Sequence, residues 1–173
     1  MNRDFSIAAH KDASDIAALV NRAYRPVAGT GGWTHETEWI RGSRTSEHQV
    51  IASMNSGSVM LIRRQADSII ACVQVSFVGS VACIGMLATD PGLQGIGHGK
   101  LMLEDAEQYA KQSGAATTLQ ISVIECRTEL VAFYERRGYR RTGRSSAYPL
   151  SGEFGVPFVG GVKVLEMTKA IRI

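Results

Sequence analysis

Residues 94–100 read Gln94-Gly95-Ile96-Gly97-His98-Gly99-Lys100, and this glycine-rich run decides how the rest of the chain is interpreted. An apolar segment, residues 81–88, precedes it, and a pattern typical of an amphipathic helix, residues 101–112, follows it. A turn of this kind at a helix N-terminus exposes N–H groups that have no partner within the helix, and the helix dipole favours negative charge there. The sequence therefore predicts a binding site for a phosphate-bearing ligand.

Spacing excludes two common phosphate loops. A P-loop needs Gly, four residues, then Gly-Lys-Ser/Thr, but Gln94 stands five positions before Gly99 and Leu101 follows Lys100. A dinucleotide fingerprint needs G-x-G-x-x-G, but Lys100 and Met102 occupy the positions where a third glycine is required. What remains is the pattern Gln-x-x-Gly-x-Gly. On its own, this pattern also fits a glycine-rich helix entry that binds no ligand.

A second pattern lies downstream, at residues 130–139, which read Leu130-Val131-Ala132-Phe133-Tyr134-Glu135-Arg136-Arg137-Gly138-Tyr139. Leu130, Phe133 and Tyr134 fall on one face of a helix by their i, i+3, i+4 spacing. Thr128 is suited to cap the start of this helix, and Gly138 stands where a left-handed C-cap is expected. The segment is therefore predicted to be a short helix that ends at Gly138 and leads into a strand.

The two patterns together, with one helix and one strand between them, resemble the acyl-CoA pyrophosphate loop and the closing motif of the GNAT (N-acetyltransferase) superfamily. The resemblance is sharp over residues 81–144. It implies an α/β (α+β) fold with a mixed central sheet of about seven strands and helices on both faces. In that fold the sheet is splayed between its fourth and fifth strands, which here are residues 81–88 and 118–124.

Hydrophobic periodicity along the chain fits this fold. We expect helices after a cap at Asp12, over 35–41, over 46–55 with Ser46 as cap and Gly57 as stop, over 101–112 and over 128–137. Strands are expected over 5–9, 59–64, 69–78, 81–88, 118–124, 139–148 and 162–168, and loops over 27–34 and 149–161.

Composition limits the other function classes. The 173 residues are expected to form one domain, and a net charge of +3 is too small to argue for nucleic-acid binding. No apolar stretch approaches the length of a membrane span, and no apolar run follows residues 1–4, so neither a membrane anchor nor a signal peptide is expected. The three cysteines have no close spacing, and Cys72 and Cys83 lie within apolar strand patterns, which favours small buried thiols over metal ligands or disulfides and predicts a cytoplasmic location.

The resemblance implies which residues bind the co-substrate, acetyl-CoA. Main-chain N–H groups of Gln94, Gly95, Ile96, Gly97, His98, Gly99 and Lys100 are expected to bind its pyrophosphate. Its pantetheine arm is expected to lie along Met86, Leu87 and Ala88, with one N–H facing the thioester oxygen. Tyr134 is expected next to the sulfur, as the general acid that protonates the CoA thiolate.

The sequence departs from the superfamily pattern at two positions. Residues 81–88 contain no acid, whereas many members carry a glutamate there as general base. Glu125 is the nearest candidate for that role, and a water relay on backbone carbonyls is the alternative. Arg127 stands where the closing motif often has asparagine, and an arginine there suits either CoA or a carboxylate of the substrate.

The acceptor is expected to be a primary amine of a small molecule. Superfamily substrate pockets imply lining by Tyr24, Trp33, His35, Glu36, Glu38 and Phe154. Glu36 and Glu38 would attract a cationic amine, or simply form the solvated face of a short helix. Two other functions stay open, a non-catalytic acyl-CoA-binding or sensing module and a nucleotide-binding regulator. Dimers are common in the superfamily, so a homodimer is allowed for.

Overall fold

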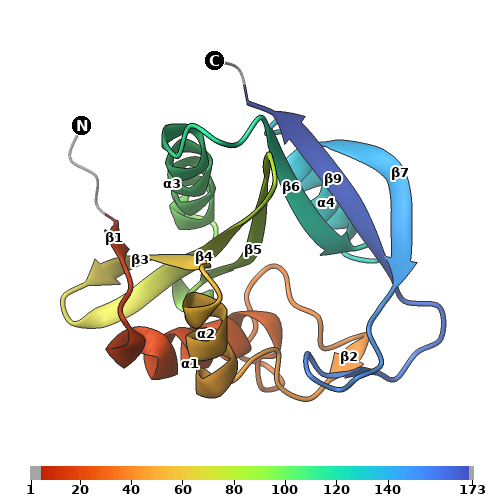
Figure 1. The fold of residues 1–173 in the computed structure, drawn as a ribbon. Helices are drawn as coiled ribbons and strands as arrows, with labels where there is room; N and C mark the ends of the chain where they lie inside the picture. The colour runs from red at the N-terminus through yellow and green to blue at the C-terminus, as the bar shows by residue number, and fades with distance from the viewer. Residues whose placement is uncertain (1–4, 172–173) are drawn as a thin grey trace.

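The computed structural model describes residues 5–171, and its main feature is a mixed sheet of seven strands (Figure 1). The strand order across the sheet is β1-β3-β4-β5-β6-β9-β7. The strands are β1 (Ser6–Ile7), β3 (Val59–Gln65), β4 (Ser68–Val78), β5 (Val81–Thr89), β6 (Thr118–Ile124), β7 (Arg140–Ala147) and β9 (Lys163–Ala170). A separate small sheet pairs β2 (Ile40–Arg41) with β8 (Val156–Pro157).

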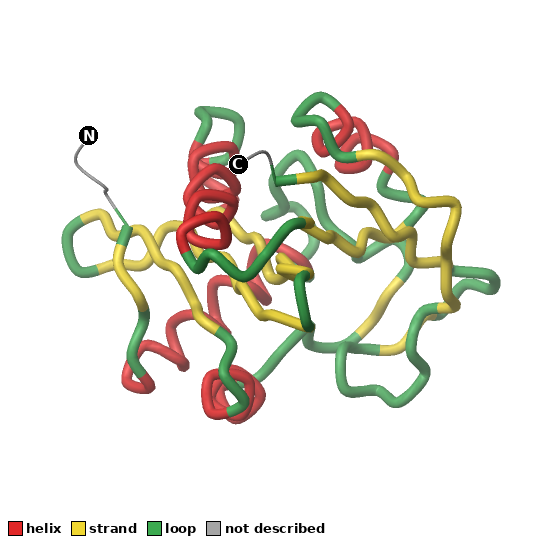
Figure 2. The backbone as a smooth tube through the Cα atoms, turned by 45° about the horizontal axis from the view of Figure 1, so that its top comes forward, coloured by secondary structure: helices red, strands yellow, loops and turns green. Residues whose placement is uncertain are grey.

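Helices cover both faces of the main sheet, as the sequence predicts (Figures 1 and 2). The helix α1 (Ala13–Tyr24) and α2 (Glu47–Asn55) pack on one face, where they share a core with β3, β4 and β5. The helix α3 (His98–Gln112) and α4 (Thr128–Glu135) contribute to the core on the opposite face. Two 3₁₀ turns, η1 (His10–Asp12) and η2 (Pro91–Leu93), lead into α1 and towards α3.

The sheet divides between β5 and β6, which confirms the predicted splay. These two strands pair in parallel only where Val81–Ile84 lie beside Thr118–Ile121. Beyond Ile84 and Ile121 the two strands no longer pair and run apart (Figure 1). The fold therefore provides a V-shaped opening in the middle of an otherwise continuous sheet.

A β-bulge lies in β5 at this opening. Cys72 pairs with Ala88 and Gln74 pairs with Gly85, so Met86 and Leu87 together oppose the single residue Val73. Met86 has a φ of 45°, an uncommon conformation for a residue with a side chain. Because a bulge removes main-chain groups from the ladder, it leaves polar backbone atoms at the opening available for other partners.

Several local predictions need correction. Residues 35–41 form no helix. Glu36 O accepts from Trp39 N and Ile40 N in a single turn. The strand β2 begins directly after this turn, because Ile40 pairs with β8. Asp12 occupies the cap position of α1, but its carboxylate accepts from Ala9 N (2.9 Å) instead of capping the helix. The residue at the cap of α4 is Arg127, one position before Thr128.

Other local predictions are confirmed. Ser46 Oγ accepts from Gln49 N at 3.2 Å as the cap of α2. Gly57 and Gly138 follow α2 and α4 with φ of 94° and 88°, the left-handed conformation expected of a helix stop. The loop predicted over 149–161 contains the two residues of β8. Residues 1–4, on which the signal-peptide prediction depends, lie outside the described residues.

Candidate functional site

Two cavities meet where β5 and β6 separate. The first, of about 250 Å³, lies between the 94–100 loop, α4 and the 33–34 segment. The second, of about 430 Å³, lies between β5, β6, the end of α1 and residues 146–154. Both are lined by Tyr24, Leu87, Arg127 and Leu130. The two cavities are therefore neighbours that share part of their walls.

The 94–100 loop gives the first cavity an anion-binding end. Gly95 and Gly97 have φ of 83° and 103°, so the loop takes a path that residues with side chains rarely adopt. The first main-chain bond into α3 runs from Leu101 N to Gly97 O (3.1 Å), which leaves the N–H groups of residues 98–100 without a partner within the helix. These N–H groups and the positive end of the helix dipole favour an anion here.

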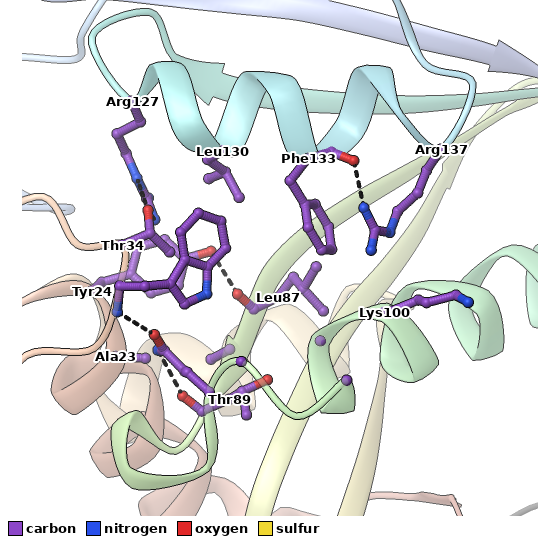
Figure 3. Close-up of a pocket in the computed structure, with 16 residues that line it drawn as sticks. Ala23, Tyr24, Thr34, Leu87, Thr89, Lys100, Arg127, Leu130, Phe133 and Arg137 are labelled. Carbon is purple, nitrogen blue, oxygen red and sulfur yellow. Dashed lines mark hydrogen bonds between the residues drawn. The ribbon is translucent and has the colours of Figure 1, made fainter.

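Two cations flank this end of the cavity. Figure 3 shows Lys100 on α3 below and Arg137, just after α4, above. Arg137 is held in place, because its guanidinium lies 3.5 Å from the Phe133 ring centroid and its Nη1 donates to Phe133 O at 2.7 Å. The first cavity therefore offers both main-chain donors and positive charge to a polyanionic group.

Gln94 fixes the loop by its side chain. Its Oε1 accepts from Trp33 N (3.0 Å), and its Nε2 donates to Thr89 O (3.2 Å). A Cβ on Gly32 would overlap the amide of Gln94, so a side chain at that position would displace the Gln94 amide from these two hydrogen bonds. Gln94 thus joins the 30–34 segment to the loop, and Trp33 of that segment lines the first cavity.

The bulge of β5 lies where the two cavities meet. Leu87 lines both cavities, Ala88 lines the first and Met86 the second. Tyr24 is fixed at the same point, because its hydroxyl donates to Leu87 O at 3.2 Å (Figure 3). The main chain of the bulge therefore lies at the junction of the cavities, where Tyr24 occupies the oxygen of Leu87.

Tyr134 lines the second cavity with a hydroxyl that donates no hydrogen bond to any residue in 5–171. Its ring is 5% exposed and packs edge-on against Phe133 and Tyr139, with ring centroids 5.3 and 5.8 Å away. Burial is the main reason that the pKa of the Tyr134 phenol is raised. The phenol is therefore held in its protonated form beside the junction.

A buried ionic network supports the second cavity. Glu36, 4% exposed, accepts from Arg25 Nη2 (2.7 Å) through one carboxylate oxygen and from Arg127 Nη1 (3.0 Å) through the other. Arg127 also donates to Thr34 Oγ1 at 2.9 Å (Figure 3), and Arg25 donates to Phe154 O at 2.9 Å. The network joins α1, the 34–36 segment, the start of α4 and the late loop around both cavities.

The structure brings most of the sequence-predicted residues together. Gln94, Gly95, Gly97, Gly99, Lys100, Leu87, Ala88, Arg127 and Trp33 line the first cavity, and Met86, Tyr134, Glu36 and Phe154 line the second. Ile96 and His98 belong to the loop without lining either cavity. Trp33 is expected from the sequence to line the acceptor pocket, but it lines the first cavity, with the 94–100 loop.

Three predicted residues lie elsewhere. Glu125 is exposed after β6, and Glu38 is exposed in the turn before β2. His35 shares a 2.8 Å hydrogen bond with Thr37. None of these three lines either cavity. Glu36, considered as an attractor for a cationic amine, is instead occupied by two arginines.

Sequence reasoning missed several lining residues. Thr34, Phe133 and Arg137 in the first cavity, and Arg44 and Tyr148 in the second, were not among the expected site residues. Arg137 lies within the closing motif, which was a usable signal. Gly85 within a strand pattern is a known sign of a bulge, and the bulge follows it directly. Arg44 carries no such signal.

Among residues 5–171, no helix is long and apolar enough to cross a membrane. The same residues contain no group of three or more His, Cys, Asp or Glu side chains placed to hold a metal ion.

Comparison with known proteins identifies related folds. The acetyltransferase (GNAT) family profile matches residues 15–139. The ribosomal-protein-S18-alanine N-acetyltransferase from Escherichia coli superposes with a TM-score of 0.73 at 18% identity, covering 98% of this chain and 94% of that one. The Salmonella typhimurium protein yncA, whose structure holds its cofactor acetyl-CoA, superposes with a TM-score of 0.69 at 17% identity, covering 100% and 96%. No curated protein matches the chain by sequence.

Proposed function

The chain belongs to the acetyltransferase (GNAT) family, and from that premise we propose that it transfers an acetyl group from acetyl-CoA to the primary amine of a small molecule. One observation carries the proposal. A helix end suited to an anion, a strand bulge and a buried tyrosine line two adjacent cavities in that order. This is the order in which the phosphates, the thioester and the acceptor amine must meet their partners.

The residues of the first cavity fit acetyl-CoA. The free N–H groups at the start of α3, with Lys100 and Arg137, suit its pyrophosphate. Apolar side chains of Leu87, Leu130 and Phe133 suit the pantetheine arm, whose amides find polar main chain at the bulge. Acetyl-CoA, when bound, supplies a thioester carbonyl that an amine can attack.

In the transfer, a bond forms between the amine nitrogen and the carbonyl carbon, and the bond from that carbon to sulfur breaks. The sulfur leaves with the electron pair and needs a proton, and the nitrogen must lose one. Tyr134 is our candidate for the proton donor, because its buried phenol is protonated at neutral pH and makes no competing hydrogen bond to a described residue. Main-chain N–H groups at the bulge are our candidates for stabilising charge on the carbonyl oxygen.

The proton acceptor on the amine side is not a free carboxylate of the described residues. Glu36 is the sole carboxylate in 5–171 that lines either cavity, and it is bound by two arginines. A positively charged environment lowers the pKa of a bound ammonium and so favours the neutral amine that attacks. Water on backbone carbonyls then suffices to take the proton, and Glu125, exposed and outside the cavities, is not needed.

The absence of a free carboxylate in these cavities also favours a second candidate function, a module that binds acetyl-CoA without transferring the acetyl group. Such a module would be stabilised by acetyl-CoA and would release no thiol with any amine. The partly enclosed second cavity favours the enzyme, because a module of that kind needs no acceptor pocket.

The test combines binding with turnover. We expect acetyl-CoA to raise the melting temperature by mass action, and thiol release to appear with a subset of a small-amine panel. Gly97→Glu should remove the thermal shift, since it places a side chain and a negative charge at the anion site. Gly114→Glu is the matched control, because Gly114 has a φ of 70°, has open space around it and lies at the other end of α3. ATP stabilising the protein while acetyl-CoA does not would overturn the proposal, and a shift without thiol release would select the binding module.

A further inference from the structure

The second cavity is rich in positive charge. Arg44 and Arg127 line it, and Arg25 stands behind its wall, whereas Glu36 is the one carboxylate of the described residues among them. Glu36 is shared between Arg25 and Arg127, which leaves Arg44 without a carboxylate partner in 5–171. An uncompensated arginine in a partly enclosed cavity attracts an anion.

Arg44 is held in position on both its main chain and its side chain. Asn21 on α1 accepts from Arg44 N (2.7 Å) and Thr45 N (3.2 Å) and donates to Thr45 O (2.9 Å). The guanidinium lies over two aromatic rings of the cavity wall, 5.5 Å from the centroid of Tyr24 and 5.0 Å from that of Phe154. These contacts hold the guanidinium in place, and its N–H groups, which donate to no described residue, are available to a ligand.

Tyr24 connects Arg44 to the junction of the cavities, where the acetyl transfer is proposed to occur. The ring that Arg44 covers carries the hydroxyl that donates to Leu87 O at the bulge, 3.2 Å away. The side chain of Tyr24 therefore extends from Arg44 to the junction of the cavities. A molecule of the size of an amino acid can reach both points at once.

We propose that the acceptor is an amino acid-like molecule whose carboxylate pairs with Arg44 while its amine lies at the junction beside Tyr134. This inference rests on the proposed function and narrows its substrate class. A carboxylate matches the planar fork of an arginine by two parallel hydrogen bonds, and it is the anion that an amino acid carries beside its amine. A polycationic amine is disfavoured, because three arginines surround a single, already paired carboxylate.

The test uses matched acceptors. The common free amino acids are assayed by thiol release with acetyl-CoA, each beside its own carboxamide, which keeps the amine and removes the negative charge. We expect the best free amino acid to exceed its carboxamide by about tenfold to a hundredfold in kcat/KM, the loss typical of one charged hydrogen-bonded pair. Equal or better turnover of the carboxamides, or of polyamines, would overturn the inference and leave the proposed function standing.

The variant Arg44→Gln identifies the residue responsible. It should raise KM for the amino acid by about tenfold or more, leave its carboxamide unaffected and leave the acetyl-CoA thermal shift unchanged. Arg41→Gln is the control, since Arg41 lies three residues earlier, packs over Phe158 at 4.4 Å and does not line the cavity. Arg44→Gln without any change in this discrimination would contradict the assignment.

A binding measurement separates this inference from the proposed function. Calorimetry of the CoA-bound protein with the same amino acids and carboxamides reports recognition without requiring turnover. Binding of the amino acid that Arg44→Gln abolishes, in the absence of thiol release, supports the carboxylate site and rejects the enzyme. No binding of any amino acid to the wild type rejects the carboxylate site.

Discussion

The two cavities are built in different ways. The anion end of the first is made from the main chain of one continuous stretch, residues 94–100, and from the helix that follows it. The second is made from side chains that arrive from α1, the 36–44 segment, β5, β6, α4 and the 146–154 segment. A main-chain site depends on where glycine allows an unusual backbone, whereas a side-chain site depends on how distant segments pack.

This difference explains which ligand each cavity suits. Diphosphate is the same in every acetyl-CoA, so a main-chain loop that ignores side-chain identity is sufficient to bind it. An acceptor must be distinguished from other amines, and that requires charges and rings in fixed positions, such as Arg44 between Tyr24 and Phe154. In the proposed function, the first cavity therefore binds the co-substrate and the second distinguishes the acceptor.

The largest effect is expected at Tyr134, where the cavities meet. Tyr134→Phe should lower kcat about a hundredfold or more, because the departing sulfur loses its proton donor. The acetyl-CoA thermal shift should remain, since the hydroxyl makes no hydrogen bond to described residues and its loss leaves the fold intact. Steady-state rates and thermal melts of the same preparation measure both quantities.

Tyr139→Phe is the control for this variant, because Tyr139 is equally buried and packs on Tyr134 without lining either cavity. The pH profile gives a second check. Burial raises the pKa of Tyr134, so the acid form persists and its ionisation should cause no loss of rate below about pH 10. An alkaline fall in rate near pH 8 that disappears in Tyr134→Phe would contradict the assignment.

The next effect concerns the network behind the second cavity. Glu36→Gln should lower the free energy of unfolding by about 3 kcal/mol, because it leaves the charges of Arg25 and Arg127 buried without a counterion. Chemical denaturation at neutral pH measures the change. Glu38→Gln, in the same turn but exposed, should change stability by less than about 0.5 kcal/mol. Equal effects of the two variants would show that the network is not a support of the fold.

The smallest effect is expected from alanine substitutions of two glycines, Gly97 at the first cavity and Gly155 beside the second. A Cβ on Gly155 would stand 2.4 Å from Arg25 Nη1 and 2.5 Å from Arg41 O, whereas a Cβ on Gly97 would meet no atom within 4 Å. Both have positive φ, so Gly97→Ala should cost about 1 kcal/mol of backbone strain, and Gly155→Ala should cost that plus about 1 kcal/mol or more from the clash. Denaturation curves compare the two directly.

The same pair sharpens the division of roles. Gly155→Ala should raise KM for the acceptor with no change in acetyl-CoA binding, because it displaces the loop that carries Phe154. Gly97→Ala should weaken acetyl-CoA binding with no change in the KM for the acceptor. If both variants weaken acetyl-CoA binding equally, the two cavities are not independent.

Most of the fold could be predicted from the sequence, because periodicity in residues 59–124 marks buried faces that do not depend on distant partners. Residues 35–41 are the counterexample. Their helical pattern gives way to a turn and to β2, since Ile40 pairs with Pro157 more than a hundred residues away. An apolar strand pattern likewise does not predict the bulge at Met86 and Leu87, although a glycine within the strand, Gly85, is a sign of one.

The sequence alone determined the family resemblance, the glycine-rich turn before α3 and the helix that carries Tyr134, because glycine spacing and a helical stripe act through local backbone geometry. Tertiary structure decided the charges. Glu36 had been a candidate to attract a cation, yet packing places it between Arg25 and Arg127, and Arg44 is left as the unpaired charge in the cavity. Which ions are neighbours depends on contacts between segments far apart in the chain, and no local pattern records those contacts.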